Sequence, residues 1–211
     1  MLQYGAVYPE TLELLNILMH QSNLNQFYLV GGTSLALQLG HRISVDLDLF
    51  TNADFETKEI IETLQHELDI QIVMQKENNS LIIHARKLKT QNEFVKIDFV
   101  KYNFPLLSEV QVFDNIRFLS QEDIIPMKLS AIANRGAKKD FYDIYELLKK
   151  YDLNTMLDLF SKKYPEIGQF HILKSLIYFD DAENQFAPIT LNDTDWQIVK
   201  RTIEKQVNEY V

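Results

Sequence analysis

A glycine pair and two alternating aspartates within residues 30–50 combine the parts of a nucleotide and metal site. Gly31 and Gly32 follow an apolar stretch, and because glycine lacks a β-carbon, a phosphate can approach the backbone closely there. Thr33 and Ser34 then open a predicted helix, whose N-terminus presents unpaired N–H groups and a partial positive charge. This turn therefore predicts a cradle for a triphosphate.

The aspartates belong to a stretch with strand-like alternation. Arg42, Ser44, Asp46 and Asp48 occupy every second position, and apolar residues occupy the positions between them. A strand would present both carboxylates on one face. Neighbouring carboxylates raise each other's pKa unless a cation lies between them. Mg²⁺, or Mn²⁺ in its place, suits such a site because Mg²⁺ binds one or two carboxylates together with substrate phosphates. A half-exposed strand without a ligand shows the same alternation, so the case depends on the glycine turn and the aspartates occurring together.

The order strand, GGTSL, helix and RISVDLDLF resembles the nucleotidyltransferase superfamily related to DNA polymerase β, and specifically its AbiEii/AbiGii toxin branch, which includes the MenT-type toxins. The resemblance implies a third carboxylate on a neighbouring strand. The segment FVKIDFV supplies Asp98, which shares a strand face with Lys96. We therefore expect Asp46, Asp48 and Asp98 to converge on one face of a mixed sheet, beside the glycine turn.

The same branch has a helical signature, K-L-x-A-x-x-x-R followed by a basic residue and D-x-x-D. This chain matches it with Lys128, Arg135, Lys139, Asp140 and Asp143. An Arg is common where Lys139 stands, and Lys cannot form a bidentate clamp. Two helical turns separate Lys128 from Arg135, so both cations can point into one groove, and Asp140 is expected to orient them. We expect Lys128 to be exposed, and surface ion pairs among these residues are the alternative interpretation.

Together these observations predict metal-dependent transfer of a nucleoside monophosphate from an NTP to an acceptor hydroxyl. The resemblance implies that the acceptor is RNA, for example a tRNA 3′ end, and that the chain is a toxin opposed by a separately encoded antitoxin. The predicted metal ligands are Asp46, Asp48 and Asp98, which are catalytic together with Lys128 and Asp140, and the predicted nucleotide-binding residues are Gly31, Gly32, Thr33, Ser34, Arg42, Lys128 and Arg135.

Two alternatives remain open at this stage. One is an enzyme of the same fold that modifies a small molecule or a protein, which suits the formal net charge of −9 better than RNA does. The other is a catalytically silent nucleotide-binding module, against which the three intact aspartates argue. From residue 128 to residue 163, eight basic residues stand against five acidic ones, which predicts a weakly basic zone or an ordinary solvated face.

Composition indicates a cytoplasmic protein. The chain has no cysteine, which excludes disulfides, zinc-thiolate sites and cysteine nucleophiles and agrees with a reducing compartment. Neither a signal-peptide pattern nor an apolar run of membrane-spanning length occurs in its 211 residues, so we expect no membrane partner. The five histidines lack ligand spacing, and His41, the one near the predicted site, is expected to be a turn residue.

The predicted fold class is α/β (α+β): a nucleotidyltransferase-type mixed sheet flanked by helices over residues 1–119, then a helical C-terminal region over residues 120–211 that completes the cleft. Residues of strand type occur at 27–30, 70–75, 81–85 and 93–100, the second and third pairing as a hairpin. Predicted helices follow Pro9 and a cap at Asp54.

The C-terminal region has clear helix boundaries. Ser120 opens a capping-box-like sequence, and Pro126 predicts a turn from which the next helix starts at Met127. Gly136 ends that helix, and another begins near Lys138.

Overall fold

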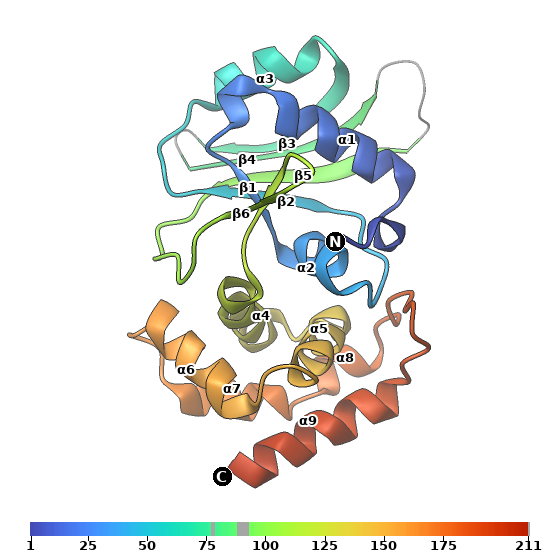
Figure 1. Cartoon of the computed structure of the whole chain (residues 1–211), viewed down its shortest axis with the longest axis vertical. Helices are drawn as coiled ribbons and strands as arrows, with labels where there is room; N and C mark the ends of the chain where they lie inside the picture. Colours follow the sequence, from blue (N-terminus) through green and yellow to red (C-terminus); the bar gives the residue numbers. More distant parts are fainter. Residues whose placement is uncertain (77–78, 88–92, 211) are drawn as a thin grey trace.

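The computed structural model describes residues 1–76, 79–87 and 93–210, which form a seven-stranded mixed sheet followed by a layer of helices (Figure 1). The predicted fold class is confirmed. The sheet half contains η1 (Tyr4–Ala6), α1 (Pro9–His20), η2 (Ser22–Leu24), β1 (Tyr28–Val30), α2 (Gly31–Leu39), β2 (Leu47–Thr51), α3 (Thr57–Gln65), β3 (Leu68–Lys76), β4 (Ser80–Lys87), β5 (Val95–Lys101), β6 (Gln111–Phe113) and β7 (Ile116–Phe118). The helical half contains α4 (Gln121–Arg135), α5 (Lys138–Leu148), α6 (Leu153–Lys163), α7 (Gln169–Leu176), α8 (Asp180–Glu183) and α9 (Trp196–Tyr210).

The strand order across the sheet is β3-β4-β5-β2-β1-β7-β6. β2 pairs in parallel with β5 and antiparallel with β1, while β1 pairs in parallel with β7. The expected hairpin is confirmed as the antiparallel pair β3 and β4, although residues 77–78 of its tip lie outside the described residues. β6 and β7 are short and carry no strong alternation, and the sequence did not predict them.

The two faces of the sheet contribute to two buried apolar clusters. Alternation in β2, β4 and β5 turns one set of apolar residues toward α1 and α3, which lie on the same side of the sheet (Figure 1). This cluster includes Leu14, Leu18, Leu49, Ile60, Leu64, Ile83, Ile97 and Phe99. The second cluster joins the opposite side of β1, through Tyr28 and Val30, to the helical half.

Helix α4 is continuous through Pro126, so the predicted turn and a helix start at Met127 are wrong. Ser120 caps the helix as expected, accepting a hydrogen bond at 3.2 Å from the Asp123 backbone N–H. Gly136, at a φ of +52°, ends it. Proline costs a helical hydrogen bond, but it lies here beside fully buried Ile124 and Ile125, whose burial offsets that loss.

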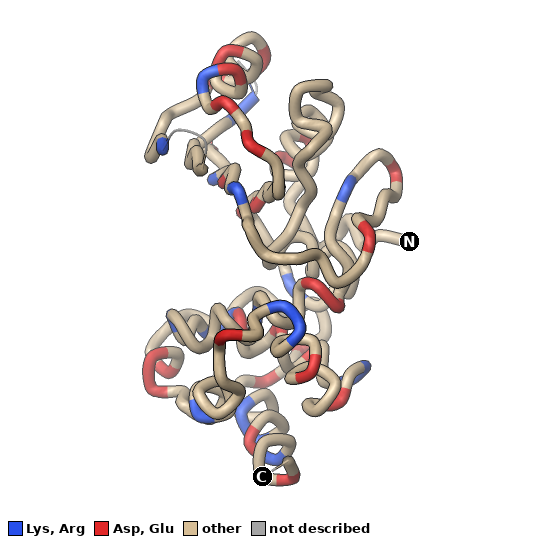
Figure 2. Tube along the Cα trace, turned by 90° about the vertical axis from the view of Figure 1, so that its left-hand side faces the viewer, with Lys and Arg blue, Asp and Glu red and all other residues tan. Residues whose placement is uncertain are grey.

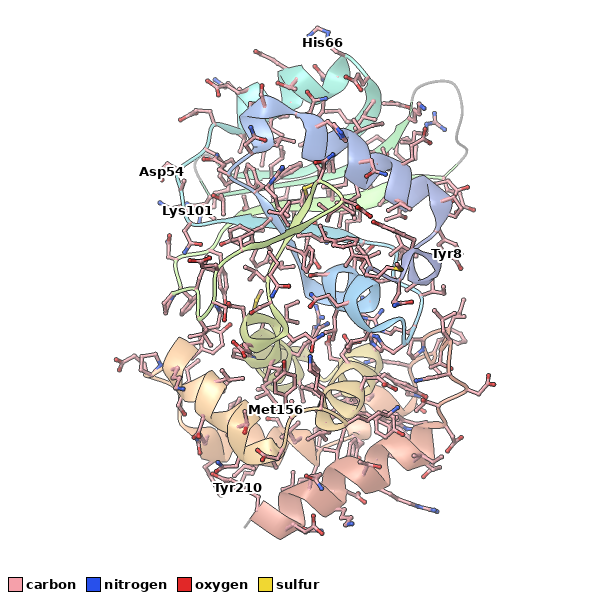
Figure 3. The ribbon with its side chains drawn as sticks, in the orientation of Figure 1. Tyr8, Asp54, His66, Lys101, Met156 and Tyr210 are labelled. Atoms are coloured by element: carbon pink, nitrogen blue, oxygen red, sulfur yellow. The ribbon has the colours of Figure 1, made fainter. Side chains whose placement is uncertain are left out.

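Two further boundaries differ from expectation. α2 begins at Gly31, two residues before Thr33, and α3 begins at Thr57. Asp54 does not cap α3, because its side chain forms an ion pair with Lys101 at 2.6 Å (Figure 3). None of the helices in the described part of the chain is long and apolar enough to cross a bilayer.

In the basic zone of residues 128–163, five of the eight basic residues are exposed, as a solvated face predicts, and three are not. Lys128, Lys138 and Lys163 are all buried. Lys163 forms an ion pair with Asp123 at 2.7 Å and donates to the Pro105 carbonyl, which ties the loop after β5 to α4 and α6. On the surface, both signs of charge are mixed along the helical half (Figure 2).

Candidate active site

A cleft of about 240 Å³ opens between the sheet and α4. Its walls come from the end of β1, the start of α2, β2, β5 and α4. Nine of the predicted site residues line it: Gly31, Gly32, Thr33, Arg42, Asp46, Asp48, Asp98, Lys128 and Arg135. Ser34 and Asp140, also predicted for the site, are buried and are not among the described residues that line the cleft.

The glycine turn is packed so closely that it excludes any side chain. Gly31 has a φ of +67°, in the left-handed region, and a β-carbon there would lie 2.1 Å from Asp48 Oδ2. A β-carbon on Gly32 would lie 2.5 Å from Arg42 Nη2. Because α2 begins at Gly31, its first backbone N–H groups have no partner within the helix. The turn thus brings the N-terminus of α2 beside the carboxylate of Asp48.

We expect Gly31→Ala to abolish activity and to lower stability. The left-handed conformation costs a residue with a β-carbon roughly 1–2 kcal/mol, and the added methyl group must also displace the Asp48 carboxylate. Gly168→Ala is the matched control, since Gly168 has a φ of −70° and a β-carbon there would meet nothing within 4 Å. Thermal melts and turnover measured on both variants make the comparison. Equal melting temperatures and turnover in Gly31→Ala and Gly168→Ala would show that the turn tolerates a side chain.

Thr33 holds the segment before β2 against the turn. Its hydroxyl is buried and hydrogen-bonds to Ser44 Oγ at 2.9 Å and to the backbone carbonyl of Asp46. Ser34, in contrast, accepts a hydrogen bond from Gln38 within α2. The expected shared face of Arg42, Ser44, Asp46 and Asp48 is found, although the regular strand starts only at residue 47.

All three predicted carboxylates line the cleft, but only Asp48 and Asp98 are neighbours. Asp48 and Asp98 are direct neighbours in the parallel pairing of β2 with β5, and Asp46 precedes β2. Burial, and then the charge of Asp98, raises the pKa of Asp48 above its ordinary value. Asp98 accepts a hydrogen bond from Lys96 Nζ at 2.5 Å through Oδ2. Asp46 Oδ2 lies 3.8 Å from Lys139 Nζ.

These carboxylates match the needs of a divalent cation in two respects. Asp98 Oδ1 is buried and accepts no hydrogen bond from the described residues, and the raised pKa of Asp48 reflects a carboxylate that lacks full charge compensation. No set of three Asp, Glu, His or Cys side chains within the described residues is arranged around a common point. Two carboxylates are nevertheless enough for Mg²⁺ when substrate phosphates supply further ligands.

Behind the cleft lies a buried network of ion pairs centred on Asp143. Arg42 donates two hydrogen bonds to it, from Nε at 2.7 Å and from Nη2 at 2.9 Å. Lys128 Nζ lies 2.6 Å from Asp143 Oδ2, and His41 Nε2 lies 2.7 Å from Oδ1. Burial favours the neutral carboxyl, but the charges of Arg42 and Lys128 outweigh it and hold the pKa of Asp143 well below its ordinary value.

Asp140 anchors the other end of this network. It accepts hydrogen bonds from Lys128 Nζ and Arg135 Nε, both at 2.9 Å, in agreement with its expected orienting position. Lys128 is 4% exposed, so the expectation that it is exposed is wrong, whereas its ion pairs with Asp140 and Asp143 do form, but in the interior. Burial opposes its charge, but Asp143 and Asp140 raise its pKa. Arg135 is half-exposed and reaches into the cleft.

Sequence reasoning missed the central position of Asp143 and the burial of His41. The D-x-x-D spacing identified Asp143, but spacing alone does not say which of its two carboxylates lies at the centre of the ion-pair network. His41 precedes Arg42, and both side chains contact Asp143. The surrounding segment, QLGHRISVD, mixes polar and apolar residues and so gives no local signal of this burial.

Solved structures with the same arrangement define the fold. JHP933 from Helicobacter pylori superimposes with a TM-score of 0.54 at 21% identity, covering 94% of each chain. MenT4, a nucleotidyltransferase toxin from Mycobacterium tuberculosis H37Rv, superimposes with a TM-score of 0.53 at 13% identity, covering 92% of this chain and 84% of that one. The mixed sheet and its helices are thus those of a nucleotidyltransferase fold.

Sequence comparison identifies the family. The model for the family described as nucleotidyl transferase AbiEii toxin, type IV TA system, matches residues 13–209. A protein of Aquifex aeolicus (strain VF5), named uncharacterized protein aq_aa25, is 32% identical over 195 residues, which are 89% of each chain. The chain belongs to the AbiEii nucleotidyltransferase toxin family.

Proposed function

We propose that this nucleotidyltransferase moves a nucleoside monophosphate from an NTP to an acceptor hydroxyl within the cleft between the sheet and α4. One observation carries the proposal: Gly31, Gly32 and Thr33 at the start of α2 line the same hollow as the neighbouring carboxylates of Asp48 and Asp98. Phosphoryl transfer needs positioning and charge neutralisation more than covalent help from the protein, and these groups supply both.

The carboxylates of Asp46, Asp48 and Asp98 would hold Mg²⁺ or Mn²⁺. When bound, the ion would neutralise charge on the phosphates and lower the pKa of the attacking hydroxyl. Asp98 offers the oxygen that lacks a hydrogen bond, and Asp48 lies closest to the glycine turn. Asp46 is 38% exposed at its side chain and lies 3.8 Å from Lys139 Nζ, so it would have to turn away from Lys139 to join the other two.

The phosphates would lie at the N-terminus of α2, against the backbone of Gly31, Gly32 and Thr33. Arg135 faces the same hollow and can neutralise the leaving pyrophosphate. Lys128 lines the cleft too, but its ammonium group is held by Asp140 and Asp143. We therefore assign Lys128 to the wall of the phosphate site, and Asp140 to positioning, since it acts through Lys128 and Arg135.

The nucleoside would occupy the apolar part of the cleft. Phe50 on β2 faces Met127 and Ala131 on α4 among the lining residues. An aromatic ring beside a methionine forms a surface on which a base can stack. These three side chains are apolar, so recognition of the base by them would depend on shape and stacking.

The acceptor we propose is an RNA 3′ end, such as that of a tRNA, and the biological setting is a toxin opposed by a separately encoded antitoxin. Membership of the AbiEii toxin family supports this setting. A protein or small-molecule acceptor is the second candidate, and the formal net charge of −9 favours it because RNA binding normally requires neutralisation of phosphates.

Transfer of label from each radioactive NTP distinguishes these acceptors. The protein is incubated with Mg²⁺, total RNA and each α-labelled NTP in turn, and label is followed into RNA, protein and small molecules. We expect Mg²⁺-dependent label in RNA, removed by EDTA and absent with Asp48→Asn. Label in protein or a small molecule would replace the RNA proposal, and lack of transfer from every NTP would refute the transfer reaction with these acceptors.

A further inference from the structure

The sheet face that carries Asp98 continues beyond the cleft across β5, β4 and β3. In the antiparallel pairing of β4 with β5, Ile82 lies beside Asp98 and His84 lies beside Lys96, so their side chains share that face. α1 and α3 cover the opposite face of these strands (Figure 1). The Asp98 side is more open: Met74 on β3 is 45% exposed, and the Lys96 side chain is 40% exposed.

This face carries cations and an aromatic ring. The Arg86 guanidinium lies over the Phe94 ring, 4.6 Å from its centroid, and also forms an ion pair with Asp69 at 2.9 Å. Lys96 stands between this pair and Asp98 along β5. The side chains of His84, Arg86 and Lys96 and the partly exposed ring of Phe94 thus lie in a row beside the candidate site. The formal net charge of the whole chain is −9. We call His84, Arg86, Phe94 and Lys96 the β4–β5 face.

The sheet order fixes the side from which an acceptor can approach. The glycine turn follows β1, on one side of β2, whereas Asp98 lies on β5, on the other side. In-line transfer requires the attacking hydroxyl and the leaving pyrophosphate to lie on opposite sides of the α-phosphate. If the phosphates occupy the glycine turn, the acceptor must arrive over β5 and β4, where the β4–β5 face lies.

The dimensions also fit a short single strand. Two residues of a strand advance by about 6.7 Å, so Phe94 lies roughly 13 Å from Asp98 along the direction of β5. Proteins bind single-stranded nucleic acid by combining cations that follow the backbone with aromatic rings on which bases stack. The β4–β5 face has both components within that distance of the carboxylates.

We propose that the β4–β5 face binds the single-stranded end of a nucleic-acid acceptor, with Phe94 stacking against a base and Arg86 and Lys96 contacting phosphates. This inference rests on the proposed transfer function, because that function sets where the acceptor hydroxyl must lie. It adds the surface that selects a nucleic-acid end over a protein or a small molecule.

Binding of a fluorescein-labelled, single-stranded oligoribonucleotide, measured by anisotropy without NTP, tests the surface independently of transfer. Phe94→Leu should weaken binding about tenfold through the loss of one stacking contact, and Phe94→Trp should restore it. Arg86→Gln should also weaken binding and lower the slope of log affinity against log salt by about 0.7, as loss of one phosphate contact predicts. Phe94→Leu should leave that slope unchanged.

The matched control is the pair Phe170 and Lys174 on α7, where a lysine lies over an exposed ring 4.5 Å away, outside the residues that line the cleft. Phe170→Leu and Lys174→Gln should bind the oligoribonucleotide like the wild type. Thermal melts identify any variant that fails to fold, and in that case Phe94→Trp and Arg86→Gln carry the test.

The outcomes separate this surface from the transfer function. Wild-type affinity in both Phe94→Leu and Arg86→Gln would overturn the proposed surface while leaving NTP turnover intact. Absence of oligoribonucleotide binding by the wild type, with label still transferred to protein or a small molecule, would overturn it too. Failure of the transfer function itself appears in the labelled-NTP assay, since oligoribonucleotide binding requires no turnover.

Discussion

Asp48→Asn is expected to abolish nucleotidyl transfer and to leave the fold at least as stable as the wild type. Asp48 adjoins both the glycine turn and Asp98, so its loss removes the carboxylate best placed to bind a metal ion near the phosphates. Such an ion supplies several kcal/mol of transition-state stabilisation, which corresponds to a rate loss of about 10³-fold or more. Turnover of labelled NTP measures the first effect, and thermal melts in EDTA measure the second.

The pH dependence of that stability gain follows from the raised pKa of Asp48. Because the carboxyl group binds its proton more tightly in the folded chain than in the unfolded one, the ionised form destabilises the fold. The gain from Asp48→Asn should therefore be full above the folded-state pKa and should vanish below the unfolded value of about 3.9. A substantial fall in melting temperature at neutral pH would instead make Asp48 a structural ion-pair partner.

Asp143→Asn is expected to cause the largest loss of stability among the site variants. Asp143 is fully buried and contacts Arg42, Lys128 and His41. Removing its charge leaves the Arg42 guanidinium without its bidentate partner, and breaking a buried pair in this way typically costs about 3–5 kcal/mol. Urea unfolding of the full chain measures the change. Asp54→Asn is the control, because its side chain is 80% exposed and a surface pair contributes at most about 1 kcal/mol.

Acid should reproduce this loss in the wild type. The pKa of Asp143 is lower in the folded chain than in the unfolded one, so the stabilisation it gives is fully present above about pH 3.9 and decreases as the pH falls toward the folded-state value. Asp143→Asn should therefore show a weaker dependence of stability on acid pH than the wild type. If stability falls equally with acid pH in the wild type and in Asp143→Asn, protonation of Asp143 does not cause the loss.

The sequence predicted the sheet side of the cleft well because each of its signals is local. Glycines at a turn and alternate aspartates that lead into a strand depend on neighbours a few residues away. Asp98 was assigned by resemblance, and the register of β5 with β2 then brings it beside Asp48. β7 escaped prediction because it pairs with β1, which lies far away in the sequence, and β6 pairs in turn with β7.

The helical side was harder to predict because charged side chains, which usually lie on the surface, are buried there. Lys128 is seven residues from Arg135, but spacing does not reveal that one is buried and the other half-exposed. An exposed Lys128 could be replaced by alanine with little effect on stability, whereas the loss of the buried lysine leaves Asp140 and Asp143 with less compensation. Long-range contacts decide such cases, as with His41 and Asp143, which are 102 positions apart.

The contact between Arg42 and Asp143 also has a mechanical consequence. Arg42 belongs to the segment that leads into the carboxylate strand, and Asp143 belongs to α5 of the helical half. A hinge that opened the cleft between them would have to separate two buried charges. The walls should therefore move as one body, so nucleotide meets an already formed cleft and its association rate should rise linearly with nucleotide concentration, without the plateau that a slow closing step would impose.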